Sequence, residues 1–212
     1  MDALKTRKKL VTNGEPDRLD DIYHTAAEII FEKGFDATSM NDIAEAVGMT
    51  KAGVYHYIPG KKDLLFALMS YALDHLESQV IAPAREIPDA DTRLRFIIKS
   101  HVKLITGENG DKGNGLISIL TDELPGLTKI HRRKIIERKR DYLNLVRETM
   151  EELKAGDKLR DLDTTVCAFT IFGTVMWLAR WYRPGGPLTG AKIADEIYQI
   201  IGSGMFKPAE KK

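Results

Sequence analysis

Apolar residues recur every three or four positions along most of this chain, the spacing that places them on one face of an α-helix. Gly, Pro and polar clusters interrupt the pattern and mark the ends of the segments. The pattern predicts helices over residues 17–33, 38–47, 50–58, 61–82, 91–105, 116–124, 127–153, 163–181 and 189–205. No segment alternates apolar and polar residues over the length of a strand. We therefore expect an all-α protein.

The stretch 38–63 has the pattern of a helix-turn-helix. Its first short helix carries Ile43 and the small Ala44, which suits a close helix crossing, and its second helix turns Val54 back toward them. Gly48 stands between the two helices, where a tight turn needs a positive φ that a β-carbon would penalise. We therefore expect Gly48 to be the hinge of the turn.

Residues that cap helices lie at the expected ends of both short helices. Thr38 or Ser39 can cap the first, and Asp42 stands three positions after Ser39, which is the spacing of a capping box. Thr50 can cap the second. Pro59 lacks a backbone donor and disfavours helix at the preceding residue, so the second helix is expected to end there.

The outer face of the second helix offers one long cation, a small residue that permits close approach, and ring donors. Contacts to DNA phosphates and base edges need such groups. An alternative stays open, in which the two helices are only a hairpin of an all-α domain and the tyrosines cover its core. On the DNA-binding hypothesis the predicted contact residues are Thr38, Ser39, Thr50, Lys51, Ala52, Gly53, Tyr55, His56, Tyr57, Lys61 and Lys62.

Residues 22–68 resemble the DNA-binding domain of the TetR family of bacterial transcriptional regulators. The resemblance is carried by Glu-Lys-Gly-Phe at 32–35, Ala-Thr-Ser-Met-x-Asp-Ile-Ala at 37–44, Val-Gly-Met-Thr-Lys-Ala-Gly-Val-Tyr-His-Tyr at 47–57 and Lys-Lys-Asp-Leu-Leu at 61–65. Ile58 departs from the family, which more often has Phe before this loop. The resemblance implies a TetR-like fold, with an N-terminal three-helix domain and a larger helical domain for ligand binding and dimerisation.

The charge balance limits the kind of nucleic-acid contact. The formal net charge is +1, and residues 1–62 hold nine Lys and Arg against ten Asp and Glu. This balance argues against indiscriminate polyanion binding and favours a small local footprint. Cys167 is the only cysteine, which excludes an intrachain disulfide, and we find no signal sequence or apolar stretch of membrane length. We expect a cytoplasmic protein.

The breaks in the pattern divide the chain into four parts. These are a flexible arm at 1–16, the helix-turn-helix DNA-binding domain at 17–62, an effector-binding and dimerisation domain at 63–206, and a tail at 207–212. The arm either reaches a DNA phosphate or the minor groove, or is a solvated tail. The helix after Gly60 begins beside the recognition helix and ends in the second domain, so we expect it to connect the two.

The segment 163–181 is apolar nearly all round, so one face can fill a core while the surplus must meet another surface. The segment 189–205 offers a second apolar stripe. Two such helices from each of two chains would form a four-helix bundle, and the resemblance implies the same interface. Such a homodimer would read a pseudo-palindromic operator in double-stranded DNA. The predicted interface residues are Val175, Ile193, Ile197, Ile200 and Ile201.

Residues 176–189 and 193–197 are similar to a narrower group of TetR-like regulators, which respond to acyl-CoA thioesters in fatty-acid, sterol or aromatic-acid breakdown. The group's repressors release DNA when the thioester binds. An acyl-CoA needs an apolar slot for its acyl chain and cations for its phosphates. A basic run after residue 130 and the cations beside two Trp residues fit that need. The predicted effector-binding residues are His131, Arg132, Arg133, Phe169, Gly173, Trp177, Arg180 and Trp181.

Other functions stay open. The basic run can be a solvated face and the two Trp residues can be core, in which case the effector is another apolar ligand, as for regulators of efflux or other metabolism. A module that only dimerises is also possible. An enzyme is disfavoured because the chain has no Gly-rich phosphate loop or HExxH motif, and His101 and His131 are too distant in sequence to imply a metal pair. We predict no catalytic residue, no metal and no cofactor besides the effector.

Overall fold

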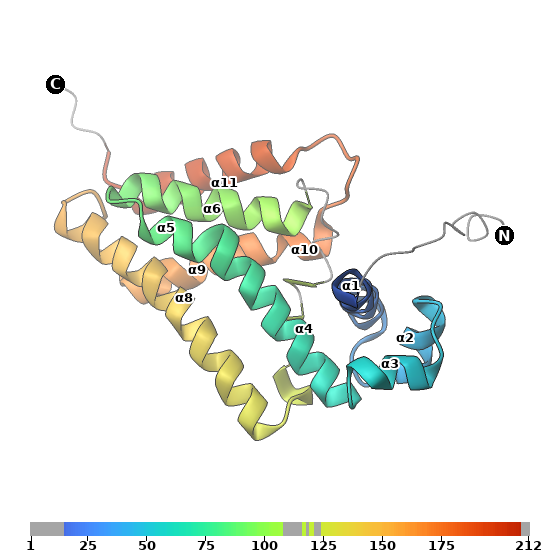
Figure 1. Ribbon diagram of the computed structural model, residues 1–212. Helices are drawn as coiled ribbons and strands as arrows, with labels where there is room; N and C mark the ends of the chain where they lie inside the picture. The colour runs from blue at the N-terminus through green and yellow to red at the C-terminus, as the bar shows by residue number, and fades with distance from the viewer. Residues whose placement is uncertain (1–14, 108–115, 118, 121–123, 209–212) are drawn as a thin grey trace.

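Helices make up most of the computed structural model, which describes residues 15–107, 116–117, 119–120 and 124–208 (Figure 1). The elements are α1 (Glu15–Lys33), α2 (Met40–Ala46), α3 (Lys51–Tyr57), α4 (Lys61–Leu76), the π-helical turn η1 (Glu77–Ile81), α5 (Ala82–Arg85), α6 (Ala90–Thr106), the 3₁₀ turn η2 (Leu124–Gly126), α8 (Lys129–Ala155), α9 (Thr164–Met176), α10 (Leu178–Trp181) and α11 (Gly190–Met205). Within these ranges no strand occurs, and Leu159 and Phe206 form an isolated bridge. The all-α prediction is confirmed.

Some predictions fall outside the described residues. Nearly all of the expected arm, residues 1–14, lies there, as do residues 209–212 of the expected tail. The short helix expected over 116–124 is described only in part, and its described residues 116–117 and 119–120 are helical. No helix in the described ranges is both long and apolar enough to cross a lipid bilayer.

Helices α1, α2 and α3 and the start of α4 share a core and form the first unit of the molecule. Ile22 of α1, Ile43 of α2, Val54 of α3 and Leu64 of α4 are all 0 % exposed. Apolar residues therefore face inward from each of the four elements, and this shared burial stabilises α2 and α3, which are too short to be stable alone. In Figure 1 this unit lies at one end of the molecule, and α4 leads from it into the larger body.

The turn and cap chemistry of this unit agrees with the sequence. Gly48 has φ of 68°, as predicted for the hinge. Ser39, not Thr38, caps α2: its Oγ accepts from the Asp42 amide at 3.2 Å, and the Ser39 amide donates to the Asp42 carboxylate at 2.8 Å. Thr50 caps α3 by accepting from the Gly53 amide at 3.0 Å. The predicted capping box and second cap are confirmed.

The sequence predicted that the helix starting at Lys61 ends before Pro83. This prediction is wrong, because the helix continues past Pro83. It passes through the π turn η1 into α5, which holds Pro83 in its first turn. Proline lacks a backbone donor and its ring clashes with the carbonyl four residues earlier in a regular α-helix. The wider π turn just before it relieves that clash, because its hydrogen bonds run five residues back.

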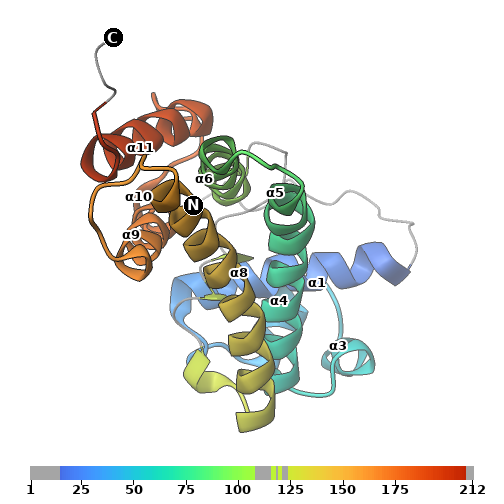
Figure 2. The same ribbon diagram turned by 90° about the vertical axis from the view of Figure 1, so that its left-hand side faces the viewer.

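The larger body is built around α6. Helices α8, α9, α10 and α11 all contact α6, and α8 also packs along α4, as Figure 2 shows from the side. The predicted single helix over 163–181 is wrong, because it divides at Trp177 into α9 and α10. There the backbone bond from Arg180 to the Trp177 carbonyl spans three residues, which tightens the helix and breaks its regular pattern.

The segment before α8, which contains η2, packs directly against the first unit. A β-carbon at Gly126 would lie 2.7 Å from Cδ1 of Phe35 and 2.8 Å from Cδ2 of Leu65. Phe35 follows α1, and Leu65 belongs to α4; both are at most 5 % exposed. Only glycine permits this approach, so the segment around Gly126 packs closely between the first unit and the larger body.

Replacing Gly126 with Ala should therefore overpack this junction. We expect the free energy of unfolding to fall by about 1 to 3 kcal/mol, as for other overpacked cores. Urea denaturation of Gly126→Ala, Phe35→Leu and the double variant measures it. Trimming the Phe35 ring should offset part of the loss, so the double variant should be more stable than the sum of the single losses predicts. Equal stability of Gly126→Ala and the parent would contradict this packing.

Candidate functional site

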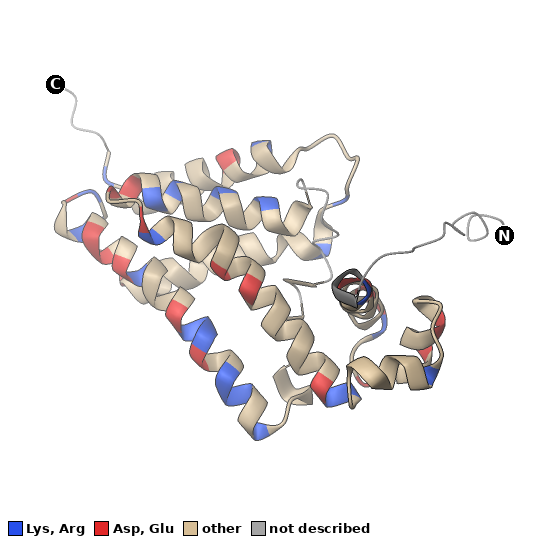
Figure 3. Cartoon of the chain, in the orientation of Figure 1, with Lys and Arg blue, Asp and Glu red and all other residues tan. Residues whose placement is uncertain are grey.

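The outer face of α3 is a solvent-exposed surface of mixed chemistry. Lys51, Ala52, Tyr55 and His56 are exposed, while Val54 on the opposite face is buried. The Lys51 ammonium lies 6.0 Å from the centroid of the Tyr55 ring. Figure 3 shows cations at the start of α3 and at the start of α4, on neighbouring parts of the same unit. A two-turn helix with this face can enter a groove of DNA, while the nearby cations can meet phosphates.

The structure separates the predicted DNA contacts into two sets. Lys62 and Ser39 are exposed beside α3, and Tyr57 and Gly53 are partly buried. Thr38 is 2 % exposed and its hydroxyl donates to the Gly34 carbonyl at 2.9 Å. Lys61 donates to the Asp36 carbonyl at 3.1 Å. Thr38 and Lys61 are thus held by the fold, and the Ser39 hydroxyl already caps α2. Lys62 is exposed and open to a partner.

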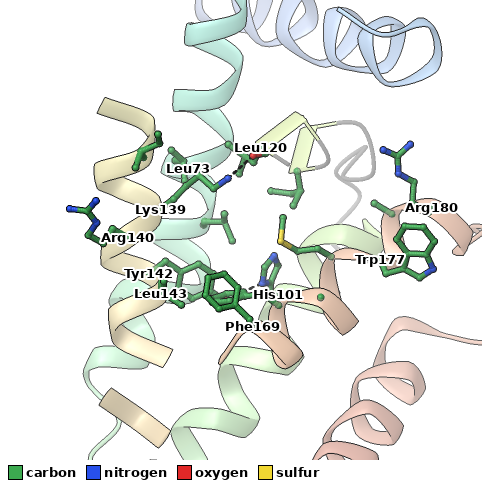
Figure 4. Close-up of a pocket in the computed structure, with 17 residues that line it drawn as sticks. Leu73, His101, Leu120, Lys139, Arg140, Tyr142, Leu143, Phe169, Trp177 and Arg180 are labelled. Carbon is green, nitrogen blue, oxygen red and sulfur yellow. Dashed lines mark hydrogen bonds between the residues drawn. The ribbon is translucent and has the colours of Figure 1, made fainter. Parts of the chain in front are cut away.

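A cavity of roughly 650 Å³ lies inside the larger body (Figure 4). Side chains from α4, α6, α8, α9 and α10 surround it. The wall is largely hydrocarbon, which suits a ligand with a substantial apolar part. The lining residues are Leu73, Leu76, His101, Ile117, Leu120, Ile136, Lys139, Arg140, Tyr142, Leu143, Phe169, Phe172, Gly173, Met176, Trp177, Ala179 and Arg180.

Few polar groups interrupt this apolar wall. Lys139 donates to the Leu120 carbonyl at 2.7 Å, and its burial lowers the pKa of that ammonium. The Tyr142 hydroxyl and Nδ1 of His101 are 3.1 Å apart in a buried hydrogen bond. Burial lowers the pKa of His101 to about 4 and raises the pKa of Tyr142. Both side chains are therefore neutral at pH 7.

The predicted effector residues do not all meet at this cavity. Phe169, Gly173, Trp177 and Arg180 line it. Arg132 and Arg133 instead line a neighbouring depression of roughly 390 Å³, the basic groove, together with Lys129, Ile136, Glu137 and Arg140. Ile136 and Arg140 belong to both hollows, so the groove adjoins the cavity.

The other two predicted effector residues lie elsewhere. His131 stacks on Phe66 of α4, with ring centroids 4.0 Å apart and planes inclined by 13°. Trp181 is 46 % exposed and is not part of the cavity wall. His131 thus joins α8 to α4, a role that its place at the head of a basic run did not suggest.

Sequence reasoning did not place His101, Lys139 and Tyr142 at the cavity. His101 lies four positions from both Ile97 and Ile105 on the buried face of α6. A polar residue in the middle of an apolar stripe is a usable signal, because burial of such a group needs a partner. Lys139 offered no signal, since it belongs to a run of cations that are otherwise largely exposed.

The residues predicted for the dimer interface fill the chain's own core instead, with one exception. Val175, Ile193, Ile197 and Ile201 are 1 to 7 % exposed within a single chain. Ile200 is 71 % exposed. The periodicity located two apolar helices correctly, but it could not tell which side of each faces inward. Outward-facing apolar residues on these helices are Val166, Phe169, Trp177, Trp181 and Ile200.

Two contacts join the cavity to the first unit. The Arg180 guanidinium, in the cavity wall, lies 5.6 Å from the centroid of the Phe31 ring of α1. On the other side, Leu73 and Leu76 of the cavity wall belong to α4, whose first turns pack in the core of the first unit. Within the described ranges no group of three or more potential metal ligands comes together.

Comparison with known proteins assigns both units. Residues 22–68 match the family of bacterial regulatory proteins described as the tetR family, and residues 88–205 match the tetracyclin repressor-like C-terminal domain. The chain is 26 % identical over 200 residues to the HTH-type transcriptional repressor KstR2 of Rhodococcus jostii, covering 93 % of this chain and 95 % of the relative. It is also 26 % identical over 187 residues to the fatty acid metabolism regulator protein of Bacillus subtilis, covering 87 % and 93 %.

Solved structures agree with this assignment. AibR, in complex with isovaleryl coenzyme A and operator DNA, superposes with a TM-score of 0.77 at 36 % identity, covering 86 % of this chain and 97 % of AibR. KstR2 of Mycobacterium tuberculosis has the same fold, with a TM-score of 0.81 at 23 % identity over 94 % of this chain and all of that one. The chain therefore belongs to the TetR family and is a DNA-binding transcriptional regulator, not an enzyme.

Proposed function

We propose that this protein is a homodimeric repressor that binds a pseudo-palindromic operator and releases it when an acyl-CoA thioester enters the cavity. The observation that carries the proposal is the junction of an apolar cavity with a basic groove through Arg140. An acyl-CoA has that same division, with an apolar acyl group joined to a polyanion. The relative AibR, whose complex holds both isovaleryl coenzyme A and operator DNA, supports the assignment.

The basic groove has the chemistry to receive phosphates. Arg132 and Arg133 are exposed at the start of α8, and Arg133 is 3.6 Å from Glu137 in an ion pair that is mostly exposed. Such an ion pair contributes little by itself, so a phosphate can replace the carboxylate at little cost. Guanidinium groups also bind phosphates by paired hydrogen bonds.

A second candidate effector is an apolar molecule without CoA, as for regulators of efflux or other metabolism. The cavity wall favours it, since most of its described residues are aliphatic or aromatic. On this alternative the basic groove is only a solvated surface. The two candidates differ in whether the phosphates of CoA add to affinity, and that difference can be measured.

Effector binding has a physical route to α3. The effector would lie against Leu73 and Leu76 of α4 and against Arg180, which also contacts Phe31. A ligand that moves α4 or draws Arg180 toward its own anionic groups therefore alters how the first unit is held. In a dimer, small rotations of the two first units change the separation of the paired α3 helices, and operator affinity depends on that spacing. The ligand acts only to the extent that it binds the released form more tightly.

We place the dimer contact on the outer faces of α9 and α11. Val166 and Gly173 of α9 and Trp177, which directly follows α9, lie at helical spacing, and Val166 and Trp177 are 63 % and 64 % exposed. Thr170 lies between them, with its hydroxyl donating to the Val166 carbonyl at 2.8 Å, so its methyl group is left for packing. Ile200 is exposed on α11, which contacts α9, and on this proposal it extends the apolar dimer surface.

The dimer contact is tested by comparing two neighbouring isoleucines of α11. Ile200→Glu should keep the fold and yield monomers, because dimerisation would bury an unpaired carboxylate. Ile197→Glu should instead unfold the chain, since Ile197 is 7 % exposed within one chain. Light scattering and thermal unfolding separate the two outcomes. A fully dimeric Ile200→Glu, Val166→Glu double variant would place the contact elsewhere.

The DNA-binding face is tested by separating phosphate from base contacts. Lys62→Ala should weaken binding to all sequences alike and reduce the slope of log affinity against log salt by about one unit. Tyr55→Ala should change sequence preference, because Tyr55 projects from the outer face of α3. Fluorescence anisotropy with operator and unrelated DNA measures both. Lys158→Ala, in the loop after α8, is the matched control and should leave the salt slope unchanged; an unchanged slope for Lys62→Ala would remove it from the phosphate contacts.

The effector is tested by release of operator DNA. Acyl-CoAs should release DNA, whereas the free acid and free CoA should not, because each makes only half of the interactions. Replacing Arg132 and Arg133 with Ala should weaken the acyl-CoA by roughly 10- to 150-fold per lost charged hydrogen bond and leave binding of the free acid unchanged. If acyl-CoAs near millimolar concentration leave the complex intact, or free acids act equally well, the alternative without CoA holds.

A further inference from the structure

A buried nitrogen in the cavity wall has no partner among the described residues. Nε2 of His101 is shielded from solvent and makes no hydrogen bond to any described residue. Three other side-chain nitrogens share this condition, on His24, His131 and Arg147, and none of those residues lines the cavity. Buried polar atoms in native proteins are nearly always paired, so an unpaired one beside a ligand cavity points to a partner supplied by the ligand.

The proton on His101 can be assigned from its bond to Tyr142. If the Tyr142 hydroxyl donates to Nδ1, then only the Nε2–H group is left unpaired. If Nδ1–H donated to Tyr142 instead, both the hydroxyl proton and the Nε2 lone pair would lack partners among the described residues. Leaving fewer buried groups unpaired is favoured. Since burial keeps the imidazole neutral, with a pKa of about 4, the ring carries one proton, on Nε2.

Two other cations of the cavity wall are already engaged. Lys139 is bonded to the Leu120 carbonyl, and Arg180 contacts the Phe31 ring. Arg140 is exposed at the side shared with the basic groove. Figure 4 shows the His101 imidazole among the apolar lining side chains, bonded to Tyr142. His101 is thus a buried donor among the apolar side chains of the wall.

We propose that His101 is a specificity-determining residue, whose Nε2–H donates to a carbonyl or hydroxyl oxygen on the effector. This inference rests on the proposed effector site and adds a requirement to it: an apolar ligand must carry an oxygen where His101 can reach it. The oxygen is either the thioester carbonyl or an oxygen farther along the acyl chain. Because Nε2 is covered when the cavity is empty, neighbouring side chains shift when the ligand binds.

The test compares three CoA compounds by direct titration, following quenching of tryptophan fluorescence. They are isovaleryl-CoA, its thioether analogue without the carbonyl, and a thioether whose alkyl chain carries a ketone. His101→Phe should weaken a ligand whose oxygen meets His101 by roughly 5- to 150-fold, which matches loss of one buried hydrogen bond, and leave the plain thioether unchanged. Loss confined to isovaleryl-CoA identifies the thioester carbonyl. Loss confined to the keto thioether identifies an oxygen on the chain.

Two further variants guard against a structural explanation. His101→Gln keeps a donor near the position of Nε2 and should retain most of the affinity. His101→Phe combined with Tyr142→Phe removes both members of the buried pair, so no polar atom is left unpaired, and the empty protein should be at least as thermally stable as the parent. If His101→Phe weakens all three ligands equally, or none, the inference is overturned.

A last arm does not depend on CoA. The affinities of 4-heptanone and heptane are compared in the parent and in His101→Phe, so that the difference in hydration of the two ligands cancels. The ratio of ketone affinity to heptane affinity should be roughly 5- to 150-fold higher in the parent than in His101→Phe. If the CoA compounds fail to bind while this preference is present, the proposed effector is wrong but His101 still selects an oxygen. If both proteins prefer the ketone over heptane equally and still bind CoA esters, the inference about His101 is wrong and the effector proposal is unaffected.

Discussion

Helix α4 belongs to two cores at once, and the rest of the structure depends on that shared burial. Leu64, Leu65 and Leu68 are 0 % exposed near its start, and Leu73 and Leu76 are at most 3 % exposed near its end. The first group completes the helix-turn-helix unit, and the last two line the cavity. Close-packed interiors do not deform continuously, so a displacement at one end of this helix must be accommodated at the other. The cavity and α3 are therefore parts of one mechanical unit.

Most of the fold could be predicted because local chemistry and long-range packing agree. Ser39, Gly48 and Thr50 act through backbone geometry within a few residues, so their roles can be found from the sequence. The π turn before Pro83 and the division at Trp177 could not, because each depends on how a long helix meets its neighbours. The inward burial of Ile193 and Ile197 escaped prediction for the same reason: helical spacing defines a stripe but not what lies against it.

The candidate sites also divide into residues that local sequence can identify and residues that depend on long-range packing. The outer face of α3 could be predicted because its residues are those that packing leaves over. For the cavity, aromatic residues such as Phe169 and Trp177 were found, but His101 and Tyr142 were not. These two lie on α6 and α8, 41 positions apart, and only the fold brings their side chains to 3.1 Å. A chemical pairing across that distance leaves no pattern in a single sequence.

Phe169 and Trp177 lie where the cavity and the proposed dimer surface meet. Both line the cavity, yet Phe169 on α9 is 59 % exposed and Trp177, just after α9, is 64 % exposed. On the proposed dimer, one surface of each ring faces the ligand and another faces the second chain. Linkage then makes the two associations reciprocal: whatever the ligand does to the affinity between chains, dimerisation does equally to the affinity for the ligand. The sensitivity of such a regulator to its signal would vary with its own abundance in the cell.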